Sequence, residues 1–285
     1  MDGLGAVEVK SLLERFDKDA SRALGQNFLI DPNIARRIAE RASEGCTRGA
    51  RAIEVGPGLG SLTVYLAELF ESVVAIELDR FVLAPLEEVL TRRALVNVEV
   101  LHEDVMKVDL DELSSDGHEW VLASNLPYNL ASQVIIGALE GAPRIRRFVV
   151  MVQSEMADRF CGSVGTKQYS SLTVKVQYFA NVSRVMKVPS AVFHPRPRVE
   201  SAVVLLERRS TLPALPGEPL YDRTFSLVRL AFGHRRQMLR RSVASFGGES
   251  LLKDASLAPT LRPEELSIDD WLRLGAASLR RDGDA

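Results

Sequence analysis

The sequence lacks the features that mark disulfide-rich, metal-binding or membrane proteins. Its only two cysteines, Cys46 and Cys161, lie far apart and have no spacing typical of metal ligands, so we predict neither a disulfide framework nor a metal site. No apolar run approaches the roughly 20 residues of a membrane span, and the first ten residues do not resemble a signal peptide. We therefore expect a metal-free protein in the cytoplasm, with no membrane partner.

The sequence also lacks a large net charge. Its 36 Lys and Arg residues nearly balance 38 Asp and Glu residues, for a net charge of −2. The overall charge therefore does not indicate a nucleic-acid partner. The charge is uneven, however, because residues 206–285 carry 13 basic and 11 acidic residues. With 285 residues, 46% of them hydrophobic, the chain is long enough for one large core, or for one large and one small domain.

Apolar runs alternate with helical patterns through the first 153 residues. Short strands are predicted at 51–56, 72–79, 97–104, 119–125 and 146–153. A helix is predicted before the first strand, at 31–42, with Asp31 as its N-cap. Further helices are predicted between the strands at 61–70, which is amphipathic, and at 80–93 and 130–139. This alternation is typical of an α/β protein, in which helices cover both faces of a parallel sheet.

The later sequence changes character. Two stretches, 180–188 and 200–208, predict neighbouring strands, expected to be antiparallel. The proline-rich segment 211–219 is followed only by helical patterns. We therefore predict an α/β catalytic domain over 1–208, with a helical extension over about 1–30, and a small helical domain over 209–285.

The first predicted strand runs into a glycine-rich loop, "EVGPGLG", which contains Glu54, Gly56 and Gly58. A dinucleotide-binding fingerprint would place its third small residue at position 61, but the glycine is at 60 and Ser61 follows it, which argues against an NAD-dependent dehydrogenase. The pattern E-x-G-x-G-x-G is instead that of enzymes that use S-adenosylmethionine (SAM). The alternative is a tight strand-to-helix turn without a ligand.

The next two strands end in acidic residues. Glu77 lies 21 positions beyond Gly56, where a carboxylate can accept hydrogen bonds from both ribose hydroxyls. Asp104 ends the third strand and can accept a hydrogen bond from an adenine amino group, although a helix cap is an equal alternative. We interpret Asp79, beside Arg80, as a solvated acid. The glycines, Glu77 and Asp104 come at the ends of three successive predicted strands. Together, in this order, they indicate a SAM site more strongly than any one of them does alone.

The fourth strand ends in "SNLPYN". The exocyclic amine of adenine is a poor nucleophile because its lone pair is delocalised into the ring. The side-chain oxygen of Asn125 and the carbonyl of Leu126 can accept hydrogen bonds from this amine, and Tyr128 can stack on the base. A structural turn with a packed tyrosine is the alternative.

Taken together, these motifs resemble the ribosomal RNA adenine-N6,N6-dimethyltransferases of the small subunit over nearly the whole chain. The matching stretches are "LGQNFLID", "IEVGPGLGSLT", "AIELDR", "SNLPYN", "VPSAVFHPRPRVESAVV" and "AFGHRRQMLRRSV". The resemblance implies the Rossmann-like sheet of class I SAM-dependent methyltransferases. It also implies cofactor contacts from Gln26, Asn27, Leu29, Leu78 and Val105.

The resemblance further implies that Phe193 packs against a flipped adenine; without it, Phe193 would be assigned to the core. Small-subunit ribosomal RNA, in a partly assembled subunit, is the implied partner, and we expect the protein to be a monomer. Basic side chains are the candidates for RNA contacts: Arg196, Arg198, Arg229, Arg235, Arg236, Arg240 and Arg241. Glu103, Gln237 and Met238 depart from the family pattern, and the last two put individual RNA contacts in question.

Three functions compete at this stage. The first is dimethylation of two adjacent adenines near the 3′ end of small-subunit ribosomal RNA during ribosome biogenesis. The second is adenine-N6 methylation of large-subunit RNA, which confers antibiotic resistance. The third is ribosome assembly by a binding protein with little catalysis. The stretch "NLPYN" and the long helical domain favour the first, while intact glycines, Asn125 and Tyr128 argue against the third.

Overall fold

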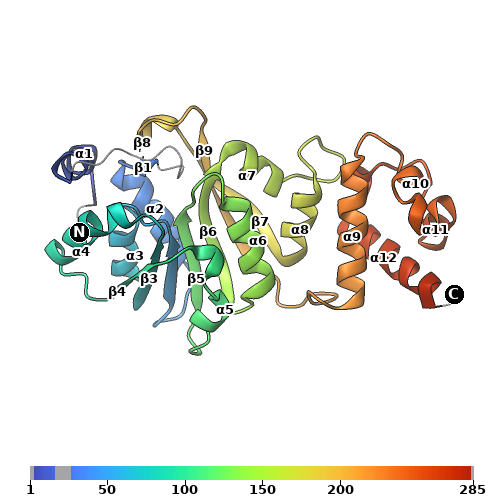
Figure 1. Cartoon of the computed structure of the whole chain (residues 1–285), viewed down its shortest axis with the longest axis horizontal. Coiled ribbons are helices and arrows are strands. Elements are labelled where there is room, and N and C mark those ends of the chain that lie inside the picture. Colours follow the sequence, from blue (N-terminus) through green and yellow to red (C-terminus); the bar gives the residue numbers. More distant parts are fainter. Residues whose placement is uncertain (1–2, 17–26, 284–285) are drawn as a thin grey trace. The chain divides into compact units, whose positions relative to one another are not determined.

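The computed structural model describes residues 3–16 and 27–283 (Figure 1). Two compact units divide the chain. The first contains the residues up to 157 together with 182–208, and the second contains 158–181 and 209–285. No helix among the described residues is long and apolar enough to cross a membrane.

A seven-stranded sheet forms the centre of the first unit, in the order β4-β3-β2-β5-β6-β9-β7. Strands β2 to β6 pair in parallel, β9 is antiparallel to β6, and β7 lies next to β9. The predicted α/β class is therefore confirmed. The strands are β2 (Arg51–Val55), β3 (Ser72–Glu77), β4 (Val98–His102), β5 (Trp120–Asn125), β6 (Ile145–Gln153), β7 (Ala180–Val188) and β9 (Ser201–Arg208).

The central strands are buried on both faces. Consecutive residues of β2, β5, β6 and β9 are buried rather than alternately exposed, as expected where helices cover both sides of a sheet. Helix α2 begins at Pro32, and Asp31 caps it by accepting hydrogen bonds from the N–H groups of Asn33 and Ile34. The helices are α1 (Ala6–Arg15), α2 (Pro32–Ser43), α3 (Thr63–Leu69), α4 (Arg80–Arg92), α5 (Leu110–Leu113), α6 (Ala131–Gly141) and α7 (Ser154–Phe160).

The sheet has its topological switch point between β2 and β5. From β2 the chain winds outward to β3 and β4, then returns to β5 on the other side of β2. Backbone pairing of β2 with β5 ends at Ile53 and Leu122. Beyond this pair, the Ser124 hydroxyl donates to the Val55 carbonyl at 2.5 Å. Backbone pairing therefore stops before the carboxyl ends of these strands, and a topological switch point of this kind is where open α/β sheets bind ligands.

A second sheet has only two short strands, β1 (Phe28–Leu29) and β8 (Phe193–His194), which pair antiparallel. The N–H of Ile30 extends this pairing by donating to the Val192 carbonyl. The sequence analysis did not predict this sheet, because two-residue strands leave no hydrophobic periodicity to detect.

The second unit is mainly helical, with α8 (Ser171–Phe179), α9 (Pro219–Gly233), α10 (Leu239–Ser242), α11 (Gly248–Asp254) and α12 (Ile268–Gly283). The sequence analysis placed 158–181 in the first domain, but this segment belongs to the second unit. Its Tyr178 ring makes edge-to-face contacts with Tyr221 and Phe225 of α9, and these contacts join α8 to the helical core.

Candidate active site

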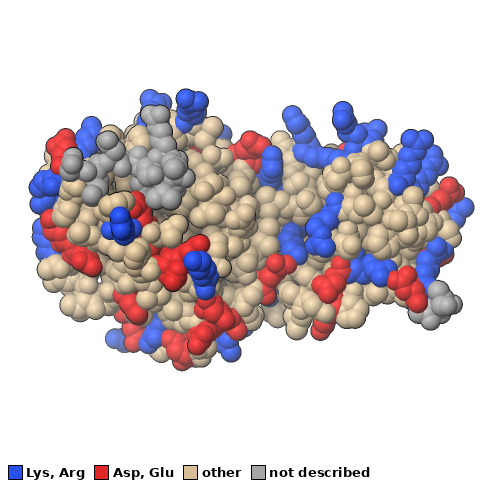
Figure 2. All heavy atoms as spheres, in the orientation of Figure 1, with Lys and Arg blue, Asp and Glu red and all other residues tan. Residues whose placement is uncertain are grey.

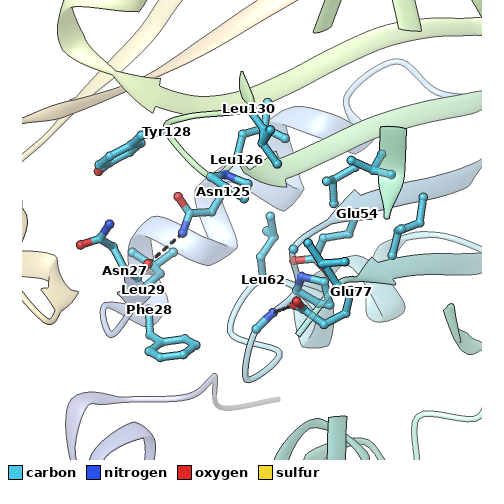
Figure 3. A pocket seen from close by; sticks show the side chains of 18 of the residues that line it. Asn27, Phe28, Leu29, Glu54, Leu62, Glu77, Asn125, Leu126, Tyr128 and Leu130 are labelled. Carbon is cyan, nitrogen blue, oxygen red and sulfur yellow. Dashed lines mark hydrogen bonds between the residues drawn. The ribbon is translucent and has the colours of Figure 1, made fainter. Parts of the chain in front are cut away.

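A cavity of about 300 Å³ opens at the carboxyl ends of the parallel strands (Figure 3). It brings together most of the residues that the sequence analysis assigned to the cofactor and the target base. They are Asn27, Leu29, Glu54, Gly56, Gly58, Glu77, Leu78, Asp104, Val105, Asn125, Leu126 and Tyr128. Gln26 lies outside the described residues. Phe193 does not line this cavity.

The glycine loop after β2 has a backbone that other residues adopt with difficulty. Gly56 and Gly58 have φ values of +69° and +55°, in the left-handed region that glycine tolerates best. A Cβ atom on Gly58 would also lie 3.0 Å from the Phe28 ring. The N–H of Gly58 donates to Oε2 of Glu77 at 3.1 Å, so the loop is joined to the next strand at the floor of the cavity.

Glu77 is held by two backbone donors. Besides Gly58, the N–H of Asp79 donates to Oε1 at 2.8 Å. Burial raises the pKa of Glu77, while these backbone hydrogen bonds lower it in part. Each carboxylate oxygen can still accept a further hydrogen bond, so Glu77 fits the two ribose hydroxyls.

The interpretation of Asp79 as a solvated acid is wrong. Its side chain is 9% exposed, and it caps helix α4 by accepting a hydrogen bond from the N–H of Phe81 at 3.0 Å. This capping geometry explains the burial, because a helix N-terminus supplies the donors that an acid needs away from water.

Asp104 acts as a cap, one of the two roles that the sequence left open, and it also lies at the cavity. Its Oδ1 accepts from the N–H of Met106 at 3.0 Å, which caps the short turn of residues 105–107, and its side chain also lines the cavity. The exposed Glu103 accepts a hydrogen bond from the N–H of Asp104 at 2.8 Å. Glu103, which departs from the family pattern, therefore adds an acidic side chain at this end of the cavity and does not displace Asp104.

Asn125 is oriented by a segment distant in sequence. Its Nδ2 donates to the backbone carbonyl of Asn27 at 3.1 Å. Because a carbonyl can only accept, this bond assigns the nitrogen to that side and turns Oδ1 the other way. In Figure 3, Oδ1 points toward the side of the cavity where Tyr128 lies. Leu126 is buried, and its N–H donates to the Met151 carbonyl.

Tyr128 is anchored at its hydroxyl. The hydroxyl lies 2.7 Å from Oγ of Ser201, the first residue of β9. Burial raises the pKa of Tyr128, so the phenol is neutral at physiological pH. This anchor restrains the ring that lines the cavity. Sequence reasoning missed the role of Ser201, which lies 73 residues away; the residue is part of a matching stretch, but nothing in that stretch indicates its partner.

Ser61 is the second residue that sequence reasoning missed. Its buried hydroxyl donates to the Leu29 carbonyl at 2.6 Å, so the segment 27–29 is fastened to the start of the helix that follows the glycine loop. The sequence analysis treated Ser61 only as a missing glycine. In the structure it helps to hold the segment whose carbonyl orients Asn125.

Phe193 belongs to the hydrophobic core in this structure. Its side chain is 3% exposed, and it pairs with Leu29 in the two-stranded sheet. It therefore packs beside the strand that lines the cavity, without reaching the cavity itself.

The candidate RNA-binding arginines divide into fixed and exposed groups. Arg235 donates to the carbonyls of Thr166 and Lys167 and forms an ion pair with Glu264. Arg240 lies 4.0 Å from Glu249. The exposed candidates are Arg196, Arg198, Arg229, Arg236 and Arg241. Figure 2 shows basic side chains gathered along one edge of the helical unit, with few acidic side chains among them.

Comparison with known proteins decides the family. The family model for ribosomal RNA adenine dimethylase matches residues 18–276. The chain belongs to the ribosomal RNA adenine dimethylase family. It is 36% identical to ribosomal RNA small subunit methyltransferase A of Bacillus mycoides (strain KBAB4), over 94% of each chain. The same protein of Bacillus cereus (strain AH187) matches with the same identity and coverage.

Solved structures of related proteins share the fold. A dimethyladenosine transferase from Plasmodium falciparum superposes with a TM-score of 0.72 at 24% identity, over 87% of this chain and 95% of the other. The 23S rRNA methyltransferase ErmE superposes with a TM-score of 0.68 at 27% identity, over 88% and 99%. Both superpositions cover most of this chain.

The burial of Phe193 gives a stability prediction. Phe193→Ala should lower the free energy of unfolding by about 3–5 kcal/mol, because it leaves a cavity in the core. Phe193→Leu keeps most of the volume and should lose about 1.5 kcal/mol or less. As a control, Phe81→Ala removes a half-exposed ring (50%) and should lose about 1 kcal/mol or less. Urea denaturation measures all three, and equal losses for Phe193→Ala and Phe81→Ala would contradict the core assignment.

Proposed function

We propose that this protein transfers methyl groups from SAM to N6 of two adjacent adenines near the 3′ end of small-subunit ribosomal RNA, which gives N6,N6-dimethyladenosine. The main support for this proposal is the orientation of Asn125. Its Oδ1 is turned toward Tyr128 because Nδ2 donates to the Asn27 carbonyl. Membership of the dimethylase family supports the same reaction.

The residues of the cavity fit SAM. Asp104, Glu77 and Asn125 stand at the carboxyl ends of β4, β3 and β5, which lie in that order around β2. Asp104 would accept from the adenine amino group, Glu77 from the ribose hydroxyls, and the glycine loop leaves room for the chain of the cofactor to approach the backbone. When bound, SAM supplies a methyl group on a positively charged sulfur with a good leaving group. Displacement of this kind requires no Lewis acid, so we propose that no metal takes part.

Asn125 and Leu126 would activate the target amine. Oδ1 of Asn125 and the carbonyl of Leu126 can each accept one N–H of adenine N6. Two such bonds rotate the amine out of conjugation, so that its lone pair faces the methyl group. After the first transfer only one N–H remains, and one acceptor then suffices. The Tyr128 ring, restrained through Ser201, would hold the base by stacking during both steps.

The two methylations also require a proton to leave the nitrogen after each transfer. The amine becomes acidic once it is methylated, and it can lose this proton to water. Tyr128 is unsuited to accept it, because burial favours its neutral form, and a neutral phenol is a poor base. The site therefore needs no dedicated base, and its contribution is to position the amine.

The partner would be the RNA of a partly assembled small subunit. Exposed arginines of the helical unit, Arg229, Arg236 and Arg241, can contact phosphates. Arg235 is better suited to fix the helical unit, because it bonds to two backbone carbonyls. We also propose that the protein acts as a monomer in the cytoplasm.

Methylation of large-subunit RNA is the second candidate, since ErmE shares 27% identity and the fold. The relatives at 36% identity carry the small-subunit name, which favours the first. Expression in a drug-sensitive host separates the two, because only the large-subunit activity should raise resistance to macrolide-type drugs. A binding protein with little catalysis would produce neither resistance nor dimethyladenosine.

Asn125→Ala tests the proposed chemistry. The variant loses an acceptor made for the reacting amine, so both methylations should slow by about 10²–10³-fold, while binding to immature small subunits stays nearly unchanged. Asn33→Ala, which changes an exposed asparagine of α2 outside the cavity, should keep the wild-type rate. Mass spectrometry of nucleosides from treated subunits measures the product. Formation of N6,N6-dimethyladenosine by Asn125→Ala at the wild-type rate would refute the proposed role.

Arg236→Glu tests the RNA-binding surface. If Arg236 contacts one phosphate, the reversal should weaken subunit binding and reduce the slope of log K against log salt by about 1. SAM affinity should not change. Arg273→Glu is the matched control, because it makes the same charge change at an arginine paired with Asp270. Equal effects of the two substitutions would show that net charge, rather than this surface, governs binding.

A further inference from the structure

Glu54 is the most unusual ionisable group in the cavity. Its side chain is 1% exposed, yet it lines the cavity, and its Oε2 has no hydrogen-bond partner. A buried carboxylate without a partner is strongly destabilised, whereas a neutral carboxyl is tolerated. Burial accordingly raises the pKa of Glu54 to about 8. In the ligand-free protein this group is therefore largely the neutral acid at pH 7.

The described residues that line the cavity around Glu54 do not supply a positive charge. The Thr63 hydroxyl of α3 interacts with the carboxyl and partly lowers its pKa, although it does not meet hydrogen-bond geometry. The charge of Glu77 on β3 raises the pKa further, and Asp79 lies beyond Glu77. Among the described residues that line the cavity, four are acidic and none is Lys or Arg: Glu54, Glu77, Glu103 and Asp104. Such a cavity suits a ligand that brings its own positive charge.

The sheet order places Glu54 at a defined point along the cavity. In sheet order, the polar groups are Asp104 just after β4, Glu77 on β3, Glu54 on β2 and Asn125 on β5. With adenine at Asp104 and ribose at Glu77, the charged sulfur and the amino acid end of SAM would lie between Glu77 and Asn125. In Figure 3 the carboxyl groups of Glu54 and Glu77 point into the same part of the cavity.

We propose that Glu54 holds a proton in the empty cavity and releases it when the positively charged end of SAM enters, so that the enzyme distinguishes SAM from its neutral thioether product. This inference rests on the proposed function. The proton passes to water on binding, and the carboxylate then pairs with the cation. Methyl transfer removes the charge from sulfur, so Glu54 takes up a proton again and the product is held less tightly.

The direction of the pH dependence follows from this exchange. Below pH 8 the free protein must lose a proton to bind SAM, so SAM affinity should rise with pH, by up to about tenfold per unit, and level off above pH 8. S-adenosylhomocysteine (SAH) has the same amino and carboxylate groups as SAM, but its sulfur is neutral. The sulfonium charge lowers the pKa of the SAM amine relative to that of SAH, so the ligand amines contribute their own pH dependence to the ratio of the two dissociation constants. The same ratio measured on Glu54→Gln contains this contribution without that of Glu54, and the comparison of the two proteins removes it.

The variant Glu54→Gln tests the protonation of Glu54. Glutamine has the size of the neutral carboxyl side chain, so the variant should fold. The empty wild-type protein keeps a proton that the unfolded chain loses above about pH 4.5, so its stability should fall between pH 4.5 and 8. Thermal unfolding should show a smaller fall for Glu54→Gln over this range. This measurement establishes the protonation of Glu54 without any ligand.

Calorimetry with SAM and with SAH, in two buffers of different ionisation enthalpy, then counts the protons released on binding. At pH 7 the wild type should release most of one proton more with SAM than Glu54→Gln does. From pH 6.5 to 8.5 the SAH-to-SAM ratio of dissociation constants should rise about 25-fold more in the wild type than in the variant, as a pKa of about 8 requires. Glu103→Gln, which removes an exposed cavity acid, should release protons as the wild type does.

The outcomes separate this inference from the function on which it rests. Equal proton release by the wild type and Glu54→Gln, or a ratio with the same pH dependence in both proteins, would overturn the role of Glu54 while SAM binding still stood. Failure of the folded wild type to bind SAM at any pH would instead overturn the cofactor assignment, and this inference would fall with it.

Discussion

The topological switch point between β2 and β5 is the constraint on which the site depends. Their backbone pairing stops at Ile53 and Leu122, and the Ser124 hydroxyl bridges to Val55 where the next pairing would be. Because the chain turns outward on either side of this point, the ends of four parallel strands surround one cavity. Each strand end contributes one polar group, and the sheet order alone sets the sequence of these groups along the cavity.

The segment around Asn27 forms the part of the site that the sheet does not provide. It pairs with the strand that contains Phe193, it is fastened by the Ser61 hydroxyl, and its carbonyl fixes the Asn125 amide. One short segment therefore forms a wall of the cavity, orients the acceptor of the target amine and touches the core beside Phe193. Loosening this segment would disturb the cofactor site and the base site together.

The sequence predicted the α/β sheet and most of the cavity because parallel strands bring their carboxyl ends to one edge, so that residues after each strand meet. It missed contacts that leave no local pattern. Ser61 meets Leu29 across 32 residues and Tyr128 meets Ser201 across 73, and the sequence around one residue of such a pair does not indicate its distant partner. The helix at 171–179 was assigned to the wrong unit because its aromatic partners lie beyond the strands that follow it in sequence.

A crystal structure of the protein with SAH tests the central claim most directly. The account predicts adenine at Asp104, ribose hydroxyls within hydrogen-bond distance of both oxygens of Glu77, and sulfur on the side of Asn125, with Nδ2 of Asn125 still bonded to the Asn27 carbonyl. A ligand bound in the opposite direction, with adenine beside Asn125 and sulfur near Asp104, would contradict the order of groups along the sheet and the mechanism built on it.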